Sequence, residues 1–250
     1  MNRIAIIGGS GLEDPGLFKK EKEETVTTPW GAPSSPLFSG RIAGREVVLL
    51  LRHGREHTIP PTQVNNRANI HALKEAGCTH ILATTACGSL REEIHRGDLV
   101  VPDQFIDFTH HRVNTFHDAF APGAMRHTPM ADPFDSRMRE LLLATARRQG
   151  LTCHPSATIV TIEGPRFSTR AESKMFRLWG ADIINMSIAP EAALANETDI
   201  PYAVIAMSTD YDSWREDEEA VRWEEVLKVF RENVHNVTEL IKDFIKDFPG

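Results

Sequence analysis

The chain has 250 residues, a length that suits one large α/β domain or two small ones. Its 28 Lys and Arg against 35 Asp and Glu give a formal net charge of −7, which argues against nucleic acid or an anionic membrane as the main partner. The sequence shows no apolar run near the ~20 residues of a transmembrane helix. Three cysteines without a CxxC pair favour reduced thiols. The short start before the first strand lacks a signal-peptide pattern, so we expect a cytoplasmic protein without membrane contacts.

Apolar runs rich in β-branched residues recur along the chain and predict buried strands. These runs cover residues 4–7, 37–42, 47–51, 81–85, 99–101, 158–162, 183–186 and 202–207. Helical patterns lie between many of them, and this alternation predicts an α/β fold with a mixed or mainly parallel sheet and helices on both faces. Neither an internal repeat nor a convincing linker is visible, so residues 1–250 are predicted to form one domain.

Start and stop signals place the helices. The first covers 62–76, and the second covers 137–149 with Ser136 as its cap. The third covers 168–179 and carries a Thr169–Glu172 capping box. A short helix begins at Pro190, and one or two amphipathic helices extend from about residue 218. The weakly periodic stretch 108–133 is a long loop of the kind that often carries function.

The opening MNRIAIIGGSGLEDPG takes a buried strand directly into glycines, an arrangement that lets backbone N–H groups approach an anion. The spacing excludes two common nucleotide motifs. Asp14 occupies the third glycine position of a dinucleotide fingerprint, and no lysine follows Gly16 as a Walker loop requires. Ser10 adds a hydroxyl donor. On this stretch alone, a phosphate contact and an ordinary tight turn are equally good interpretations.

Other strand ends also carry anion donors. Arg52 and His53 follow the strand 47–51, where a guanidinium fork and an imidazole suit a tetrahedral anion. His57 lies four residues beyond His53, but the Glu of HExxH and a third ligand are missing, so we predict no metal. The segment TTACGS at 84–89 offers small residues and hydroxyls that can cradle a phosphate or a sugar. Cys87 within it is better interpreted as a packed small residue than as a nucleophile.

Two carboxylates, Asp210 and Asp212, follow the strand 202–207. At this spacing they face the same side if the backbone stays extended, and close like charges raise one pKa toward neutral pH. A general acid, a metal site and a solvated turn all remain open on spacing alone. Phe167 offers an aromatic face for a planar ligand or fills the core. Taken together, several anion donors and one carboxylate pair favour free phosphate as a co-substrate.

Six separated motifs occur in order: IGGSGL, RHGREHTIPP, TTACGSL, TIEGPRFSTRAE, WGADIINMS and STDYDSW. Through them the chain resembles the methylthioadenosine phosphorylases of the trimeric purine nucleoside phosphorylase family over nearly its whole length. The resemblance implies a single-domain mixed sheet flanked by helices, a homotrimer and no cofactor. It also implies a pentosyltransferase of purine and methionine salvage, which converts methylthioadenosine and inorganic phosphate to adenine and methylthioribose 1-phosphate.

The same resemblance implies roles for individual residues. Phosphate contacts would come from Ser10, Arg52, His53, Thr85, Ala86 and Ser187. Met186 would lie against the ribose, and Phe167, Ser168, Asp210 and Asp212 would hold the purine. Specificity would depend on Ser168, Asp212 and Trp223, and the pocket for the methylthio group would use Trp223, Val226 and Leu227 together with His127 of a neighbouring subunit.

In the implied reaction, Asp210 protonates N7 of the departing purine, and Asp212 accepts a hydrogen bond from the 6-amino group. Family members that act on 6-oxopurines tend to carry Asn at the second position, so the Asp pair favours adenine. Trp223 is bulkier than the residue expected there, and the chain ends soon after its last helix. The alternatives are a broader phosphorylase acting on adenosine, inosine or methylthioinosine, a nucleosidase that uses water, and a non-catalytic nucleoside-binding module.

Overall fold

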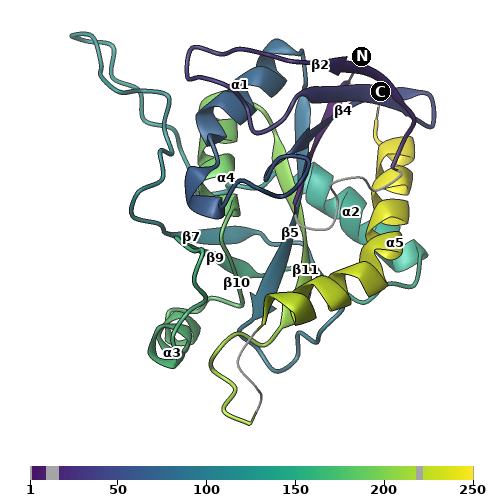
Figure 1. Cartoon of the computed structure of the whole chain (residues 1–250), viewed down its shortest axis with the longest axis vertical. Helices are drawn as coiled ribbons and strands as arrows, with labels where there is room; N and C mark the ends of the chain where they lie inside the picture. The colour runs from purple at the N-terminus through teal and green to yellow at the C-terminus, as the bar shows by residue number, and fades with distance from the viewer. Residues whose placement is uncertain (1, 10–16, 218–221, 250) are drawn as a thin grey trace.

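The computed structural model describes residues 2–9, 17–217 and 222–249. Within these residues a central sheet of eleven strands is flanked by helices on both faces (Figure 1), which confirms the predicted α/β class. The strands are β1 (Ile4–Gly8), β2 (Lys20–Glu24), β3 (Leu37–Ile42), β4 (Arg45–Leu51), β5 (His80–Ser89), β6 (Leu99–Val100), β7 (Gln104–Phe108), β8 (Cys153–His154), β9 (Thr158–Ile162), β10 (Ile183–Asn185) and β11 (Tyr202–Asp210). The helices are η1 (Pro61–Gln63), α1 (Asn66–Glu75), α2 (Ser136–Arg148), α3 (Arg170–Leu178), α4 (Ile188–Glu197) and α5 (Trp223–Asp247).

Strand β5 is the centre of the sheet. It pairs in parallel with β1 and β11, and its last residues pair antiparallel with β10. The main path runs β2-β3-β4-β1-β5-β10-β9-β7, and β11 leads from β5 to β6 and β8. Because β4, β5 and β11 are parallel to one another through β1 and β5, their carboxyl ends meet at one edge of the sheet, where ligands bind in open α/β sheets.

Two apolar layers enclose the sheet. In β1, Ala5 and Ile7 join the cluster that includes α1 and α4, whereas Ile4 and Ile6 join the cluster that includes α2 and α5. This alternation follows from the two-residue period of a strand. All four side chains are buried, so the central strands have apolar residues on both faces, as the continuous hydrophobic runs predict.

The helices differ from prediction mainly at their ends. The expected helix 62–76 divides into η1 and α1. Helix α2 is capped by Asp135, whose side chain accepts from the Met138 N–H, and the predicted cap Ser136 is the first helical residue. A carboxylate one position earlier meets the same requirement for an acceptor. The capping box of Thr169 and Glu172 is confirmed, and α5 is one continuous helix.

Strands β2, β7 and β8 were not predicted. Strand β2 has the sequence KEKEE and is exposed along its length, so it has no apolar pattern and depends on pairing with β3. The segment after β7, residues 109–133, extends away from the body as a long arm (Figure 1). Its start is held by Glu197, which accepts from Thr115 Oγ1 and from the Phe116 N–H, each at 2.7 Å.

Candidate active site

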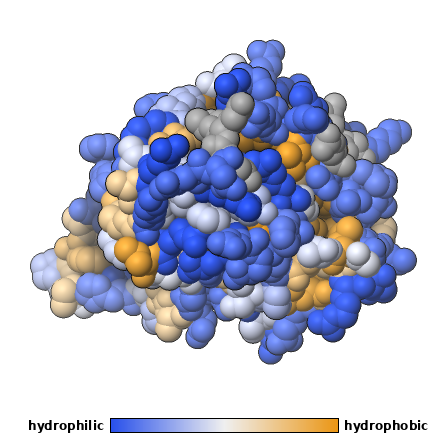
Figure 2. Space-filling model, turned by 90° about the horizontal axis from the view of Figure 1, so that it is seen from below, coloured by the Kyte–Doolittle hydropathy of each residue, from blue (hydrophilic) through white to orange (hydrophobic). Residues whose placement is uncertain are grey.

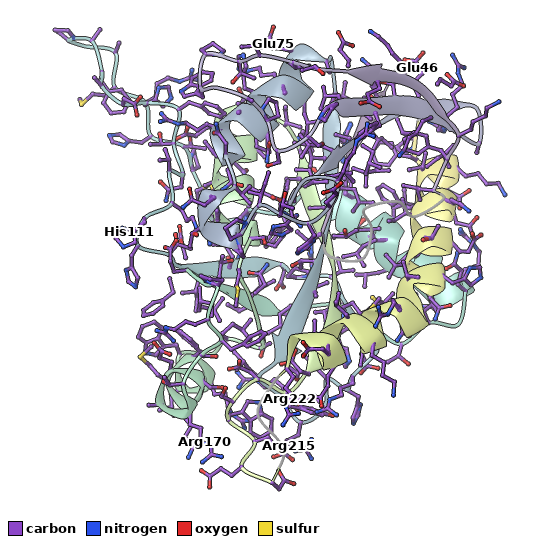
Figure 3. All side chains as sticks on the ribbon, in the orientation of Figure 1. Glu46, Glu75, His111, Arg170, Arg215 and Arg222 are labelled. Atoms are coloured by element: carbon purple, nitrogen blue, oxygen red, sulfur yellow. The ribbon has the colours of Figure 1, made fainter. Side chains whose placement is uncertain are left out.

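A cavity of about 300 Å³ lies at the carboxyl ends of β4, β5, β10 and β11. In Figure 3, the labelled Arg215 and Arg222 lie at the end of the molecule toward which β5 and β11 lead, and the labelled His111 lies to one side. Figure 2 views the molecule from this end and shows a mainly hydrophilic surface with separate hydrophobic patches. The cavity is lined by Arg52, His53, His57, Pro61, Thr85, Ala86, Cys87, Gly88, Ile162, Pro165, Phe167, Ile184, Asn185, Met186, Ser187, Thr209, Asp210, Asp212 and Val226.

Arg52 lies at one end of this cavity and is only 1% exposed. Its Nη1 donates to the Thr84 carbonyl at 2.8 Å, and its Nε and Nη2 donate to the carboxylate of Glu191. Gly9 makes room for this arrangement, because a Cβ there would lie 2.6 Å from Nη1 of Arg52 and from the Thr84 carbonyl. The glycine at the end of β1 therefore allows the guanidinium and the backbone to pack closely.

Two further donors line the same end. The Nδ1 of His53 lies 2.8 Å from the Ile59 carbonyl, and since a carbonyl only accepts, Nδ1 carries a proton in this contact. Thr85 Oγ1 donates to the Ala86 carbonyl at 2.9 Å and lies 3.4 Å from Asn185 Nδ2. To donate to a bound anion, the Thr85 hydroxyl has to rotate away from that carbonyl.

Ser187 is the N-cap of α4, and its hydroxyl makes no capping hydrogen bond. The first N–H groups of a helix have no intrahelical partners and carry a partial positive charge. The Ala189 N–H is already satisfied by Thr161 Oγ1 at 3.1 Å. The amino end of α4 and the Ser187 side chain thus form a favourable environment for an anion beside Arg52.

Met186 lines the cavity, and neighbouring residues hold it in position. Its Sδ would lie 2.5 Å from a Cβ placed on Gly164, so the absence of a side chain at Gly164 allows the thioether to pack against the backbone. Arg112, from the base of the arm, donates to the Met186 carbonyl at 3.1 Å and to Glu163 Oε1 at 2.8 Å. Both the side chain and the main chain of Met186 are therefore held in place.

Asp210 and Asp212 lie together at the other end, where Asp210 is the last residue of β11 and Asp212 follows in a turn. The pairing of β11 with β5 shifts register between Ser208 and Asp210, and a bulge of this kind redirects a side chain near a site. Asp212 has φ of +45°, and its N–H donates to Asp210 Oδ1 at 2.8 Å. The backbone does not stay extended between the two residues, and a turn closed by the Asp210 side chain brings the carboxylates into one cavity instead.

The surroundings of both carboxyl groups favour their protonated forms. Burial raises the pKa of Asp210 to about 6, and the nearby Asp212 charge adds to the rise, against hydrogen bonds from the Asp212 N–H and Thr209. Burial also raises the pKa of Asp212, opposed by a hydrogen bond from Ser168, whose Oγ lies 2.6 Å from both carboxylate oxygens. Asp210 is thus suited to act as a proton donor near neutral pH.

The structure brings most of the predicted site residues to this one cavity. Arg52, His53, Thr85, Ala86, Phe167, Met186, Ser187, Asp210 and Asp212 line it, and Ser168 contacts it through Asp212. Ser10 lies outside the described residues. Trp223 is the first residue of α5, but its side chain is not among those described. Val226, one turn further, is buried and lines the cavity.

Sequence analysis missed the residues that contact and position Arg52 and Asp210. Glu191 and Thr209 contact Arg52 and Asp210 respectively, and Gly88 gives Asp210 room, because a Cβ there would lie 2.9 Å from Asp210 Oδ1. A signal for Glu191 exists, since it is a charged residue inside the apolar helix IAPEAALA. Within the described ranges, no group of three or more potential ligands could hold a metal ion, and none of the described helices is long and apolar enough to cross a bilayer.

The chain belongs to the phosphorylase superfamily, whose family model matches residues 3–246. The S-methyl-5′-thioadenosine phosphorylases of Danio rerio and Xenopus tropicalis are each 56% identical to it, over 96% of this chain and 86% of each relative. The solved structure of methylthioadenosine phosphorylase from Schistosoma mansoni in complex with adenine superposes with a TM-score of 0.93 at 44% identity, covering 98% of this chain and 91% of that one. A mutant adenosine/methylthioadenosine phosphorylase from the same organism, in complex with methylthioadenosine, gives 0.92 at 43% identity with the same coverage.

Proposed function

We propose that this chain is a pentosyltransferase that catalyses phosphorolysis of S-methyl-5′-thioadenosine. One observation carries the proposal: a single cavity has anion donors around Arg52 at one end and two carboxyl groups, the half-buried Asp210 and the buried Asp212, at the other. A nucleoside placed between them presents its sugar to the anion and its base to the acid. The names of the relatives and the ligands in the Schistosoma complexes support the same substrate.

The proposed reaction uses the two ends in one step. An oxygen of phosphate attacks the anomeric carbon while the bond from that carbon to the purine nitrogen breaks, and the bonding electrons remain on the purine. The anion stabilises the cationic sugar of the transition state, and Asp210 gives its proton to N7 of the departing adenine. The products are adenine and 5-methylthioribose 1-phosphate. Inorganic phosphate is the co-substrate, and the bond exchange requires no redox cofactor.

The remaining site residues have roles consistent with this chemistry. Ser10, Arg52, His53, Thr85, Ala86 and Ser187 would hold the phosphate. Met186 would pack against the ribose, Phe167 against the purine, and Asp212, oriented by Ser168, would accept a hydrogen bond from the 6-amino group. A 6-oxo base would instead place its own acceptor against the Asp212 carboxylate, at a cost of about 1–3 kcal/mol for the unsatisfied group.

The assembly we propose is a homotrimer. Its support is the arm 109–133, which extends from the body (Figure 1) and exposes Phe120 at 43% and Met125 at 72%. Apolar side chains on such an extension favour a protein partner. A second copy of the chain would bury them and bring His127 toward the methylthio pocket near Val226 and Trp223. We also propose a cytoplasmic location, which is supported by the three unpaired cysteines.

The deciding experiment measures adenine release from methylthioadenosine with and without inorganic phosphate, together with the sugar product. We expect release to require phosphate and to yield methylthioribose 1-phosphate, with adenosine used less well and inosine least. Adenine release that is indifferent to phosphate would identify a nucleosidase instead. Preference for inosine would identify a broader purine nucleoside phosphorylase, and ligand binding without turnover would identify a binding module.

A further inference from the structure

Behind the phosphate end of the cavity lies a buried carboxylate, Glu191, in the first turn of α4. It is 0% exposed and forms a two-pronged ion pair with Arg52, through Nε to Oε1 at 2.5 Å and Nη2 to Oε2 at 3.0 Å. The hydroxyl of Tyr202, itself 1% exposed, donates to the same Oε2 at 2.8 Å. None of these contacts involves Asp210 or Asp212 at the other end of the cavity.

These contacts fix the direction of the guanidinium. Of its five N–H donors, two bind Glu191 and one binds the Thr84 carbonyl. The Tyr202 side chain also interacts with the guanidinium, and Arg52 lines the cavity. A planar fork held along one edge presents its other donors in a fixed geometry, which is what a tetrahedral oxyanion needs.

The pair also fixes the charge of this end. Burial on its own disfavours a charged guanidinium, but the Glu191 carboxylate outweighs it and raises the pKa of Arg52. Arg52 and Glu191 together carry no net charge. The other donors beside them, the Thr85 and Ser187 hydroxyls and the amino end of α4, are neutral, and Asp210 and Asp212 share the cavity. An oxyanion here meets oriented hydrogen-bond donors, and Arg52 adds no uncompensated full positive charge.

We infer that Glu191 is a positioning residue that orients Arg52 and cancels its charge, so that phosphate is held by directed hydrogen bonds and both phosphate and the sugar phosphate can dissociate. The inference rests on the proposed phosphorolysis. Its consequence is unusual for a positioning residue: removing the charge of Glu191 while keeping its shape makes anion binding tighter. Removing the donor that Tyr202 supplies has the opposite effect, because the carboxylate then attracts Arg52 more strongly.

The test compares wild type, Glu191→Gln and Tyr202→Phe by calorimetric titration with inorganic phosphate, alongside the phosphate KM and kcat. Gln keeps the size of Glu191 and one acceptor, so we expect Kd for phosphate to fall roughly tenfold, with a lower kcat from slower release. Phe keeps the ring that stacks on Phe134, and we expect Kd for phosphate to rise by a few-fold. Thermal unfolding of each variant shows that it is folded before titration.

The opposite directions in which the two variants change Kd for phosphate distinguish this role from a purely structural one. If Glu191 only supports the fold, Glu191→Gln loses thermal stability and binds phosphate no more tightly than wild type, and the inference is overturned. Unchanged or tighter binding in Tyr202→Phe also overturns it, and this second variant decides the matter if Glu191→Gln does not fold. A wild-type protein that neither binds nor requires phosphate would overturn the proposed phosphorolysis as well. If wild type depends on phosphate but Kd does not change in the expected direction in the variants, only the inference about Glu191 is overturned.

Discussion

At the phosphate end of the cavity, the charge of Arg52 is matched by that of Glu191 in a buried ion pair. At the base end, two carboxyl groups lie together and are held by neutral donors, with Thr209 on Asp210 and Ser168 on Asp212. Burial disfavours the charged form of the ionisable groups at both ends, but the resulting pKa shifts differ. A paired charge stays fixed over the physiological pH range, whereas carboxyl groups that lack such compensation shift their pKa toward neutrality.

This difference shows how one cavity can combine binding and proton transfer. The phosphate end has to present the same donors in every catalytic cycle, so a permanently charged, rigid group suits it. The base end has to gain and lose a proton, so a group with a pKa near the working pH suits it. The following experiments test whether the two ends are separable in this way.

The largest expected effect is on turnover at the base end. Asp210→Ala removes the proposed acid, and we expect kcat for methylthioadenosine to fall by roughly 10²–10⁴-fold, while the Kd for phosphate stays near its wild-type value. Asp247→Ala is the matched control, because Asp247 forms a surface pair with Arg148 at the carboxyl end of α5. Steady-state kinetics and phosphate titration check both. Unchanged kcat in Asp210→Ala would show that Asp210 is not the acid.

The next effect is on stability. The pKa of Asp210 is about 6 in the folded protein, against an ordinary value of 3.8 for an aspartate, so the folded state binds this proton more tightly than the unfolded state. Its contribution to the free energy of unfolding therefore decreases as pH rises from about 4 to about 6, by about 3 kcal/mol in total. Asp210→Asn removes this titration.

Urea unfolding at pH 4 and pH 7 measures this effect. We expect the stability of Asp210→Asn relative to wild type to increase by about 2 kcal/mol between the two pH values, because pH 4 lies just above the unfolded pKa and part of the total change falls below it. The other titrating groups are common to both proteins and cancel in the difference. Parallel pH profiles for the two proteins would mean that Asp210 is not buried in the way described, and the contrast between the two ends would be lost.

A smaller effect concerns the choice of base. Asp212→Asn replaces one carboxylate oxygen by an NH₂ donor, which can satisfy the acceptor of a 6-oxopurine. We expect the ratio of kcat/KM for inosine to that for adenosine to rise roughly 10–100-fold, equivalent to about 1–3 kcal/mol. The phosphate KM should stay constant. A constant inosine-to-adenosine ratio would contradict the assignment of base selectivity to Asp212.

The smallest effect is expected at the phosphate end. Ser187→Ala removes one neutral hydroxyl at the amino end of α4, and a single hydrogen bond of this kind contributes about 0.5–1.5 kcal/mol. We expect the phosphate KM to rise roughly 2- to 10-fold, with base selectivity and the pH dependence of stability unchanged. If Ser187→Ala altered the inosine-to-adenosine ratio as well, the two ends would not be separable.

The sequence allowed the residue types at the site to be recognised, but not the residues and backbone features that position them. The apolar runs located the strands, and the polar residues after them were grouped correctly because the carboxyl ends of parallel strands meet at one edge. An extended backbone would have placed Asp210 and Asp212 on the same side, but a bulge and a left-handed residue position them instead. A bulge depends on the register of β11 against β5, which no local pattern records.

Long-range partners were also beyond sequence analysis. Glu191 and Arg52 are 139 residues apart, and nothing near either residue shows that they pair. The exposed strand β2 was missed for a similar reason, since its KEKEE sequence has no apolar side and β3 alone brings it into the sheet. The cap of α2 was misplaced by one residue because Asp135 and Ser136 both suit the position.

By itself, the sequence determined the fold class, the strands that form the core and the set of polar residues at their ends, because hydrophobic periodicity and helix signals are local properties of the chain. Tertiary structure alone decided which of these residues share a cavity, which charges are compensated and which carboxyl groups have a raised pKa. Those properties depend on burial and on the distance between groups far apart in sequence, and both arise only when the sheet assembles.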